Sequence, residues 1–150
     1  MTDHPATATA ETDAGAASGP RAGFWRRAGA ALVDGVILVI PYLILVAVVS
    51  QALAYAIYLA YTIAYFTALE GSASGQTLGK RALGIRVIDF RTGGSIGPAR
   101  AALRYVARIL SALPFGLGYF WMLWDREKQT WHDKLSTNVV VPVDAYPVSR

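Results

Sequence analysis

The feature that most restricts the fold of this chain is a run of 35 residues, Gly35 to Leu69, without a charged side chain. A single helix of that length would measure about 52 Å, far longer than the bilayer's hydrocarbon core of about 30 Å. Because about 20 apolar residues are enough for one crossing, the run predicts two membrane helices, at about 28–49 and 52–69. Ser50 and Gln51 are the only polar pair in the run, so we expect the hairpin turn there.

A second uncharged run, Ile109 to Trp124, predicts a third membrane segment at about 109–124. Proline and glycine residues between Leu113 and Gly118 interrupt it, which fits a broken or re-entrant segment as readily as a straight span. Two β-branched stretches, Ile85–Val87 and Thr137–Val141, read as strands. They could pair only if both lay on one side of the membrane, so we favour the re-entrant alternative.

The composition supports a membrane protein. Apolar residues make up 54 % of the chain and charged residues 16 %, against about 25 % charged residues in a typical soluble domain. We expect an all-α membrane fold with a small cytoplasmic β element, spanning residues 22–143. Residues 1–21 have the composition of a disordered tail, and their charges do not suit a secretory signal. Residues 144–150 are predicted to form a short C-terminal tail.

Several classes of function are not expected. The chain has no cysteine and two histidines, so we predict neither a metal site nor a cofactor. Gly75–Arg81 resembles a phosphate-binding loop but has three residues between its glycines and an arginine after the lysine, which does not fit the motif. No nucleophile with a base and an orienting group can be assembled, so we do not predict an enzyme.

The loop between the hydrophobic runs is basic. Glu70 and Asp89 are the only acids there, against seven cations: Lys80, Arg81, Arg86, Arg91, Arg100, Arg104 and Arg108. The positive-inside rule places this loop and the N-terminus in the cytoplasm. We expect anionic lipid headgroups as neighbours of the loop. Nucleic acid is not expected, because the loop is short, lies between membrane segments and has few aromatic residues.

Asp34 is an ionisable residue inside the first predicted membrane helix. Placing a charge there costs roughly 2.5–3.5 kcal/mol on insertion scales, and such residues are usually functional. Arg27 precedes it by seven residues, about 10 Å along the helix axis, too far for direct pairing. Arg104 or Arg108 could supply a partner. Asp34 could thus belong to an ion or proton site, or to a structural ion pair that fixes helix register.

Small residues recur every fourth position along the second predicted helix, at Ala52, Ala56, Ala60, Ala64 and Ala68. Small residues at this spacing allow another membrane helix to approach closely. We therefore expect this stripe to be a helix-packing face, and a homo-oligomer is one way to fill it.

The motifs occur in an order that resembles the RDD family, a bacterial group of membrane proteins named for one arginine and two aspartates. Phe24–Arg27 followed by Val33–Gly35 resembles its opening motif. Thr77–Val87 is similar to its central loop, and Gln129–Lys134 to its closing motif.

The resemblance implies which residues carry the family pattern. Arg27 would be the family's arginine, Asp34 its first aspartate and Asp133 its second, and Arg104 resembles an arginine often found where the third segment begins. It also implies a multi-pass protein of the bacterial cytoplasmic (inner) membrane. Transport of ions or small ligands has been proposed for such proteins.

Two functions are therefore expected alternatives. In a cation/proton exchanger, Asp34 would bind the ion or proton, Arg27 and Arg104 would set its charge, and Asp133 would gate from the cytoplasmic side. Three segments enclose no pathway alone, so this alternative requires an oligomer. In a non-transporting scaffold or accessory protein, the same residues would only hold the helices together.

Overall fold

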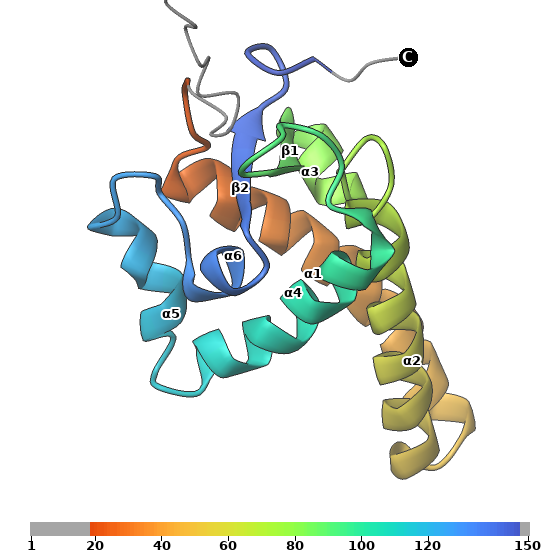
Figure 1. The fold of residues 1–150 in the computed structure, drawn as a ribbon. Coiled ribbons are helices and arrows are strands. Elements are labelled where there is room, and N and C mark those ends of the chain that lie inside the picture. The colour runs from red at the N-terminus through yellow and green to blue at the C-terminus, as the bar shows by residue number, and fades with distance from the viewer. Residues whose placement is uncertain (1–18, 148–150) are drawn as a thin grey trace, which may run out of the picture.

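The computed structural model describes residues 19–147, so most of the predicted N-terminal tail (1–21) and the last residues of the C-terminal tail (144–150) lie outside the described residues. In chain order the elements are α1 (Phe24–Val48), α2 (Gln51–Glu70), α3 (Leu78–Ala82), β1 (Ile85–Asp89), α4 (Gly97–Ala112), α5 (Leu117–Phe120), the 3-10 turn η1 (Trp121–Leu123), α6 (Trp131–Leu135) and β2 (Asn138–Pro142) (Figure 1).

The two long apolar helices form the predicted hairpin. Helices α1 and α2 are both long and apolar enough to cross a membrane. Ser50 lies in the turn and its hydroxyl accepts a hydrogen bond from the amide of Leu53, which caps the start of α2. Helix α1 begins at Phe24, four residues earlier than expected, because the aromatic and basic cluster before Ala28 continues the helix.

The third hydrophobic segment is not one straight helix. Helix α4 and the stretch Leu117–Leu123 meet at an angle of 110°. Gly116, with φ of 75°, lies at the break in the left-handed region that glycine tolerates. The predicted segment at 109–124 thus contains the last residues of α4, which begins at Gly97, and the expected break, where the chain turns sharply after Ala112. That this bent segment enters the membrane stays a prediction.

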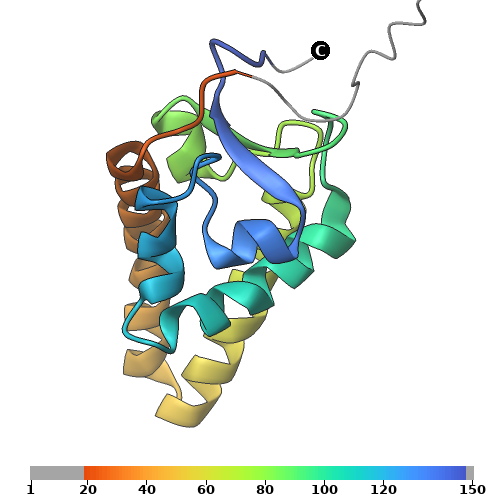
Figure 2. The same cartoon turned by 60° about the vertical axis from the view of Figure 1, so that its left-hand side comes forward.

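The two predicted strands pair as expected. Strands β1 and β2 are antiparallel, with Ile85 opposite Pro142 and Asp89 opposite Asn138. The bent helices thus return the chain to β1, which agrees with the re-entrant alternative. The two-stranded sheet, α3 and α6 together form a polar cap at the end of the hairpin away from its turn (Figures 1 and 2).

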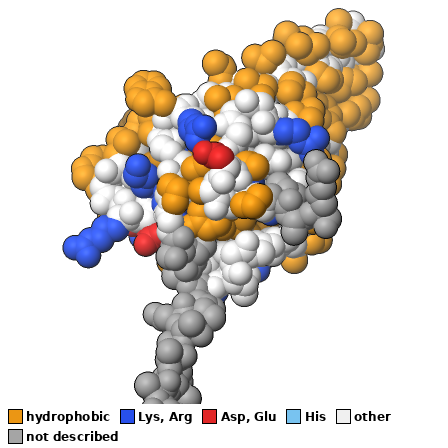
Figure 3. All heavy atoms as spheres, turned by 90° about the horizontal axis from the view of Figure 1, so that it is seen from above, with side chains coloured by type: hydrophobic (Ala, Val, Ile, Leu, Met, Phe, Trp, Pro, Cys, Tyr) orange, Lys and Arg blue, Asp and Glu red, His pale blue; other side chains and the backbone are white. Residues whose placement is uncertain are grey.

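The core is small and lies beneath the sheet, between α1 and α4. Its main cluster of buried residues is Ala22, Ala30, Ile85, Val87, Ile96, Ala101 and Val140. Most of the hairpin surface is instead exposed and apolar, for example Leu32 and Val48, which are 70 % and 72 % exposed. Figure 3 shows hydrophobic side chains over the part of the hairpin that projects beyond the cap. Such a surface matches a lipid environment.

Candidate functional site

Asp34 is buried on the side of α1 that packs against α3, where it is 2 % exposed. One carboxylate oxygen accepts hydrogen bonds from the Gly79 amide at 2.7 Å and the Tyr65 hydroxyl at 2.7 Å, and the other accepts one from the Thr77 hydroxyl at 2.6 Å. Thr77 also caps α3. Asp34 therefore joins α1 to α2 and α3 through hydrogen bonds.

The local sequence explains how α3 comes so close to α1. A Cβ atom at Gly79 would lie 2.1 Å from the carbonyl oxygen of Ala30 and 2.8 Å from the Asp34 carboxylate. Only glycine permits this approach, because real Cβ atoms do not come that near to a backbone oxygen. The glycine of the Thr77-Leu78-Gly79 motif therefore serves helix packing.

Glu70, the last residue of α2, is the centre of a buried charge network that sequence reasoning missed. Its carboxylate is 1 % exposed and contacts three cations. Lys80 of α3 donates to it at 2.6 Å, Arg104 of α4 donates at 2.9 Å, and Arg108 of α4 also donates to it. A buried carboxylate needs such partners, because desolvation strongly disfavours an isolated charge.

Arg104 extends this network to Asp133 of α6. The Arg104 guanidinium also donates to Asp133 and to the amide oxygen of Asn138, and it is 1 % exposed. Arg27 of α1 donates to the other Asp133 oxygen at 2.7 Å. Asp133 in turn accepts from the amide of Thr130 and completes a capping box at the start of α6.

The network fixes the charge of the residues in the cap. Burial alone would raise the pKa of Asp133, but Arg104 and Arg27 outweigh it and hold the pKa well below its usual range. Burial lowers the pKa of Lys80 to about 8, against the opposing effect of Glu70. Burial likewise lowers the pKa of His132 well below its usual range, so this histidine is neutral at pH 7.

The structure brings three of the four predicted site residues together and separates the fourth. Arg27, Arg104 and Asp133 share one set of ion pairs. Asp34 makes no ion pair within residues 19–147, and the arginines expected to pair with it, Arg104 and Arg108, pair with Glu70 instead. The missed members are Glu70, Lys80 and Asn138. Glu70 could have been found in the sequence because it is one of only two acids in a segment with seven cations, which makes it an expected ion-pair partner.

Arginines recur every fourth residue along α4, at Arg100, Arg104 and Arg108, and this basic stripe faces acidic residues of neighbouring elements. Arg100 pairs with Asp89 of β1, while Arg104 and Arg108 pair with Glu70. The stripe is therefore largely occupied by internal acids. The exposed basic side chains of the described chain lie elsewhere, and include Arg26, Arg81, Arg91, Arg126 and Lys128.

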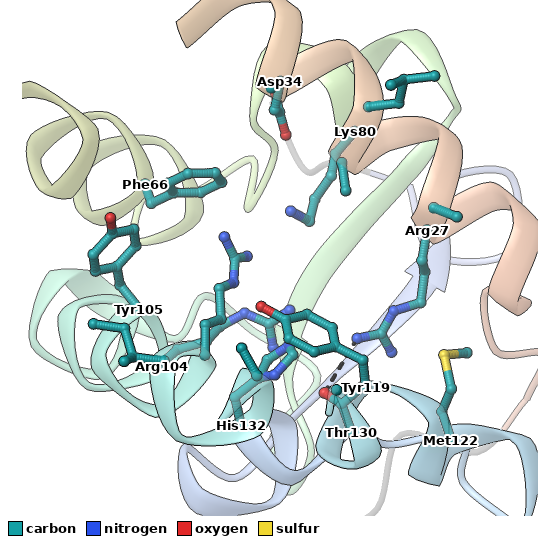
Figure 4. A pocket seen from close by; sticks show the side chains of 18 of the residues that line it. Arg27, Asp34, Phe66, Lys80, Arg104, Tyr105, Tyr119, Met122, Thr130 and His132 are labelled. Carbon is teal, nitrogen blue, oxygen red and sulfur yellow. Dashed lines mark hydrogen bonds between the residues drawn. The ribbon is translucent and has the colours of Figure 1, made fainter. Parts of the chain in front are cut away.

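A cavity of about 940 Å³ lies against this network, within the upper part of the size range of small-molecule sites. Its walls come from α1, α2, α4 and α5, with residues of α3 and α6 at its inner end. Figure 4 shows Arg27, Lys80 and Arg104 reaching toward it from three elements. Asp34 and Arg108 also line it, whereas its remaining walls are mainly apolar.

Comparison with known proteins decides the family. The model of the RDD family matches residues 21–137, which is most of the chain. The chain belongs to the RDD family. Membership agrees with the two candidate membrane helices, and the matched range includes Arg27, Asp34 and Asp133.

Curated relatives of this RDD protein carry names that give no activity. It is 33 % identical over 85 residues to the proline-rich antigen homolog of Mycobacterium tuberculosis (strain ATCC 25618 / H37Rv), covering 57 % of this chain and 35 % of that protein. It is 34 % identical over 71 residues to the proline-rich antigen of Mycobacterium leprae (strain TN), covering 47 % of this chain and 28 % of that protein. The chain thus spans about a third of the length of these relatives.

A relative of similar length is the uncharacterized protein YxaI of Bacillus subtilis (strain 168). It is 29 % identical over 147 residues, covering 80 % of this chain and 96 % of that protein. No solved structure matches this RDD protein.

Proposed function

We propose that this RDD protein is a membrane transporter of small ligands or ions and that the cavity between α1, α4 and α5 is its binding site. The observation that carries the proposal is the composition of the cavity, in which four cationic side chains meet apolar helix walls: Arg27, Lys80, Arg104 and Arg108. Charged groups in a membrane domain are costly and tend to mark ligand or ion pathways.

Within this proposal, an anionic small ligand fits the site better than a cation. Asp34 already accepts three hydrogen bonds, so a cation would have to displace donors from its carboxylate. Glu70 and Asp133 are likewise saturated by arginine and lysine. Cation/proton exchange remains the alternative transport mode, and it requires Asp34 to release these donors.

The alanine stripe of α2 supports a homo-oligomer. Ala52, Ala56, Ala60, Ala64 and Ala68 are all exposed in the single chain. The α1–α2 contact uses another face of α2, where Ala54 is fully buried. A second copy could approach closely along the exposed stripe. Two or more hairpins together would supply the pathway that one lacks.

We further propose that the cap faces the cytoplasm of a bacterial cell, with the protein in the inner membrane. The support is the excess of lysine and arginine in the segment between α2 and α4. The N-terminus would then also be cytoplasmic, because Ala22 hydrogen bonds to Val140 of β2 in the cap.

A non-transporting scaffold is the second candidate function. It is favoured by the charge network itself, which joins α1, α2, α3, α4 and α6 and could serve stability alone. On this alternative the cavity would be a by-product of the bent third segment.

Flux measurements in proteoliposomes separate the candidates. Purified protein would be reconstituted with an internal pH dye, and Na⁺, K⁺, Li⁺ or inorganic phosphate added outside. Transport predicts a flux above protein-free liposomes that Gly35→Phe abolishes, because Gly35 lines the cavity and its Cβ position is open. Gly29→Ala, on the same helix, is the matched control. Cation-driven proton flux lost in Asp34→Asn would favour exchange, and no flux for any probe would favour the scaffold.

A further inference from the structure

We infer that the cavity holds the headgroup of an anionic phospholipid, with the phosphate at the charge network and an acyl chain leaving between α1, α4 and α5. The inference rests on the proposed function only in taking the cavity as the ligand site. It differs from the expectation of lipid headgroups near the basic loop, because it assigns one cavity with a defined lining.

The charge of the cavity favours an anion. Four cations line it or its inner end, whereas three carboxylates lie on or behind the same wall: Asp34, Glu70 and Asp133. Every one of these cations has a carboxylate partner, but the set as a whole carries a net charge of +1, in a site of low polarity where attraction for an anion is strong. His132 adds no charge, because burial lowers its pKa.

The guanidinium of Arg108 has N–H groups that could donate to a ligand. Within the described chain its side chain makes one hydrogen bond, to Glu70, although a guanidinium has five N–H groups. Its plane lies over the Phe66 ring at 4.2 Å, which orients it, and its side chain is 16 % exposed, the most of the network's four cations. Arginine in a fixed orientation is well suited to a phosphate group.

A second unsatisfied group lines the cavity. The hydroxyl of Thr62 on α2 is buried and has no hydrogen-bond partner among the described residues. A buried hydroxyl without a partner costs free energy, so a ligand that accepts or donates a hydrogen bond would relieve this cost. The ester and hydroxyl oxygens next to a phospholipid phosphate have that chemistry.

The rim of the cavity is apolar and open. Leu32 of α1, Ile109 of α4 and Phe120 of α5 line the cavity and are 70 %, 54 % and 44 % exposed. A free phosphate ion would gain nothing from this rim, whereas an acyl chain would bury against it. The rim therefore selects an amphiphile over an inorganic anion.

The depth of the site also fits a headgroup. Arg27 near the start of α1 and Glu70 at the end of α2 lie at the same end of the antiparallel hairpin, opposite the turn at Ser50. The charge network is therefore near one membrane surface and the helices continue into the hydrocarbon. Basic pockets between membrane helices at this level are known to hold anionic lipid headgroups.

Native mass spectrometry of the full chain tests the inference. Phosphatidylglycerol and phosphatidylcholine with identical acyl chains would be titrated onto detergent-purified protein, and inorganic phosphate would be used as competitor. We expect phosphatidylglycerol to bind at least tenfold more tightly than phosphatidylcholine, and millimolar phosphate not to displace it. Full displacement by phosphate would identify a free-anion site and overturn the lipid assignment.

Three variants locate the binding. Arg108→Gln should weaken phosphatidylglycerol at least tenfold, while Glu70 keeps Lys80 and Arg104 as partners. Arg91→Gln removes the same charge from an exposed site and should change binding less than twofold. Gly35→Phe keeps every charge, fills open space and should abolish binding. Equal losses in the two arginine variants, or normal binding in Gly35→Phe, would overturn the inference.

The outcome is separable from that of the proposed function. Selective lipid binding without flux in proteoliposomes would leave the lipid site standing and reject transport. Flux without a preference for phosphatidylglycerol would support transport and reject the lipid site.

Discussion

The carboxylate of Asp34 in α1 accepts a 2.7 Å hydrogen bond from the backbone amide of Gly79, 45 residues later, at the first turn of α3. An aspartate next to a helix start is favourable, because the first amides of a helix have no partner within it. The contact brings a polar loop against a membrane helix. It explains how an acid can lie inside α1 without an ion pair to any residue of 19–147.

Gly79→Ala should destabilise the protein by about 3 kcal/mol, the upper end of the cost of overpacking. The new methyl group would lie 2.1 Å from the Ala30 carbonyl oxygen, and backbone cannot move aside easily. Thermal unfolding in detergent measures the effect. Gly29→Ala is the control, since its methyl group meets only Leu83 at 3.5 Å, and it should be neutral or stabilising by up to about 1 kcal/mol. Equal effects of both changes would show that the α1–α3 approach is not tight.

Glu70→Gln should cost about 3–5 kcal/mol of unfolding free energy, the loss typical of breaking a buried charge network. The change leaves Lys80, Arg104 and Arg108 facing one another without their shared carboxylate. Glu127→Gln removes an equal charge from a more exposed pair with Arg21 and should cost no more than about 1 kcal/mol. Chemical unfolding measures both variants, and equal losses of unfolding free energy in Glu70→Gln and Glu127→Gln would contradict the prediction.

His132 should make the protein less stable in mild acid. Burial lowers its pKa well below 6.5 in the folded chain, despite the opposing effect of Asp133 and with further lowering by Arg104, Arg108 and Arg27. The unfolded chain therefore binds a proton first, and the free energy of unfolding falls as the pH drops below 6.5.

The fall can reach about 1.4 kcal/mol per pH unit for one group. His132→Gln should flatten the unfolding profile between pH 6.5 and 5. Over this range carboxylates with pKa values below 4, such as Asp133, stay ionised in both variants. An unchanged slope in the glutamine variant would assign the acid sensitivity to other groups.

Single cysteines should report one side of the membrane for the cap and the other for the hairpin turn. The background is clean because the chain has no cysteine. Arg91→Cys and Asp144→Cys flank the paired strands and should react from the same face, whereas Ser50→Cys should react from the opposite face. A membrane-impermeant maleimide applied to intact cells and to everted vesicles measures this. Labelling of Arg91→Cys and Asp144→Cys from opposite faces would exclude the re-entrant third segment.

Much of the fold could be predicted from the sequence because membrane insertion leaves simple signals. The 35-residue uncharged run and its polar pair fixed the hairpin and its turn within a few residues. The strand pairing followed from two β-branched stretches. The exact course of the third segment did not follow, because its proline and glycines allow several geometries of which the structure adopts a 110° bend.

The candidate site was predicted only in part, for a physical reason. Sequence patterns relate residues along one helix, such as Arg27 and Asp34, but ion pairs form between elements that pack together. Asp34 accepts a hydrogen bond from the backbone of α3, and the α4 arginine Arg104 forms an ion pair with Glu70. The sequence shows that Glu70 is one of only two acids in a segment with seven cations. It does not show where Glu70 lies relative to α4, because that depends on how α2 and α4 pack.

The pairing of Arg27 with Asp133 also means that one partner is synthesised well before the other. Arg27 emerges from the ribosome 106 residues before its partner, and domains form from the N-terminal end as the chain is made. The hairpin can therefore enter the bilayer while Arg27 is still an unpartnered cation. During synthesis, the start of α1 must therefore stay at the hydrated surface of the bilayer until α6 is made and Asp133 can pair with Arg27.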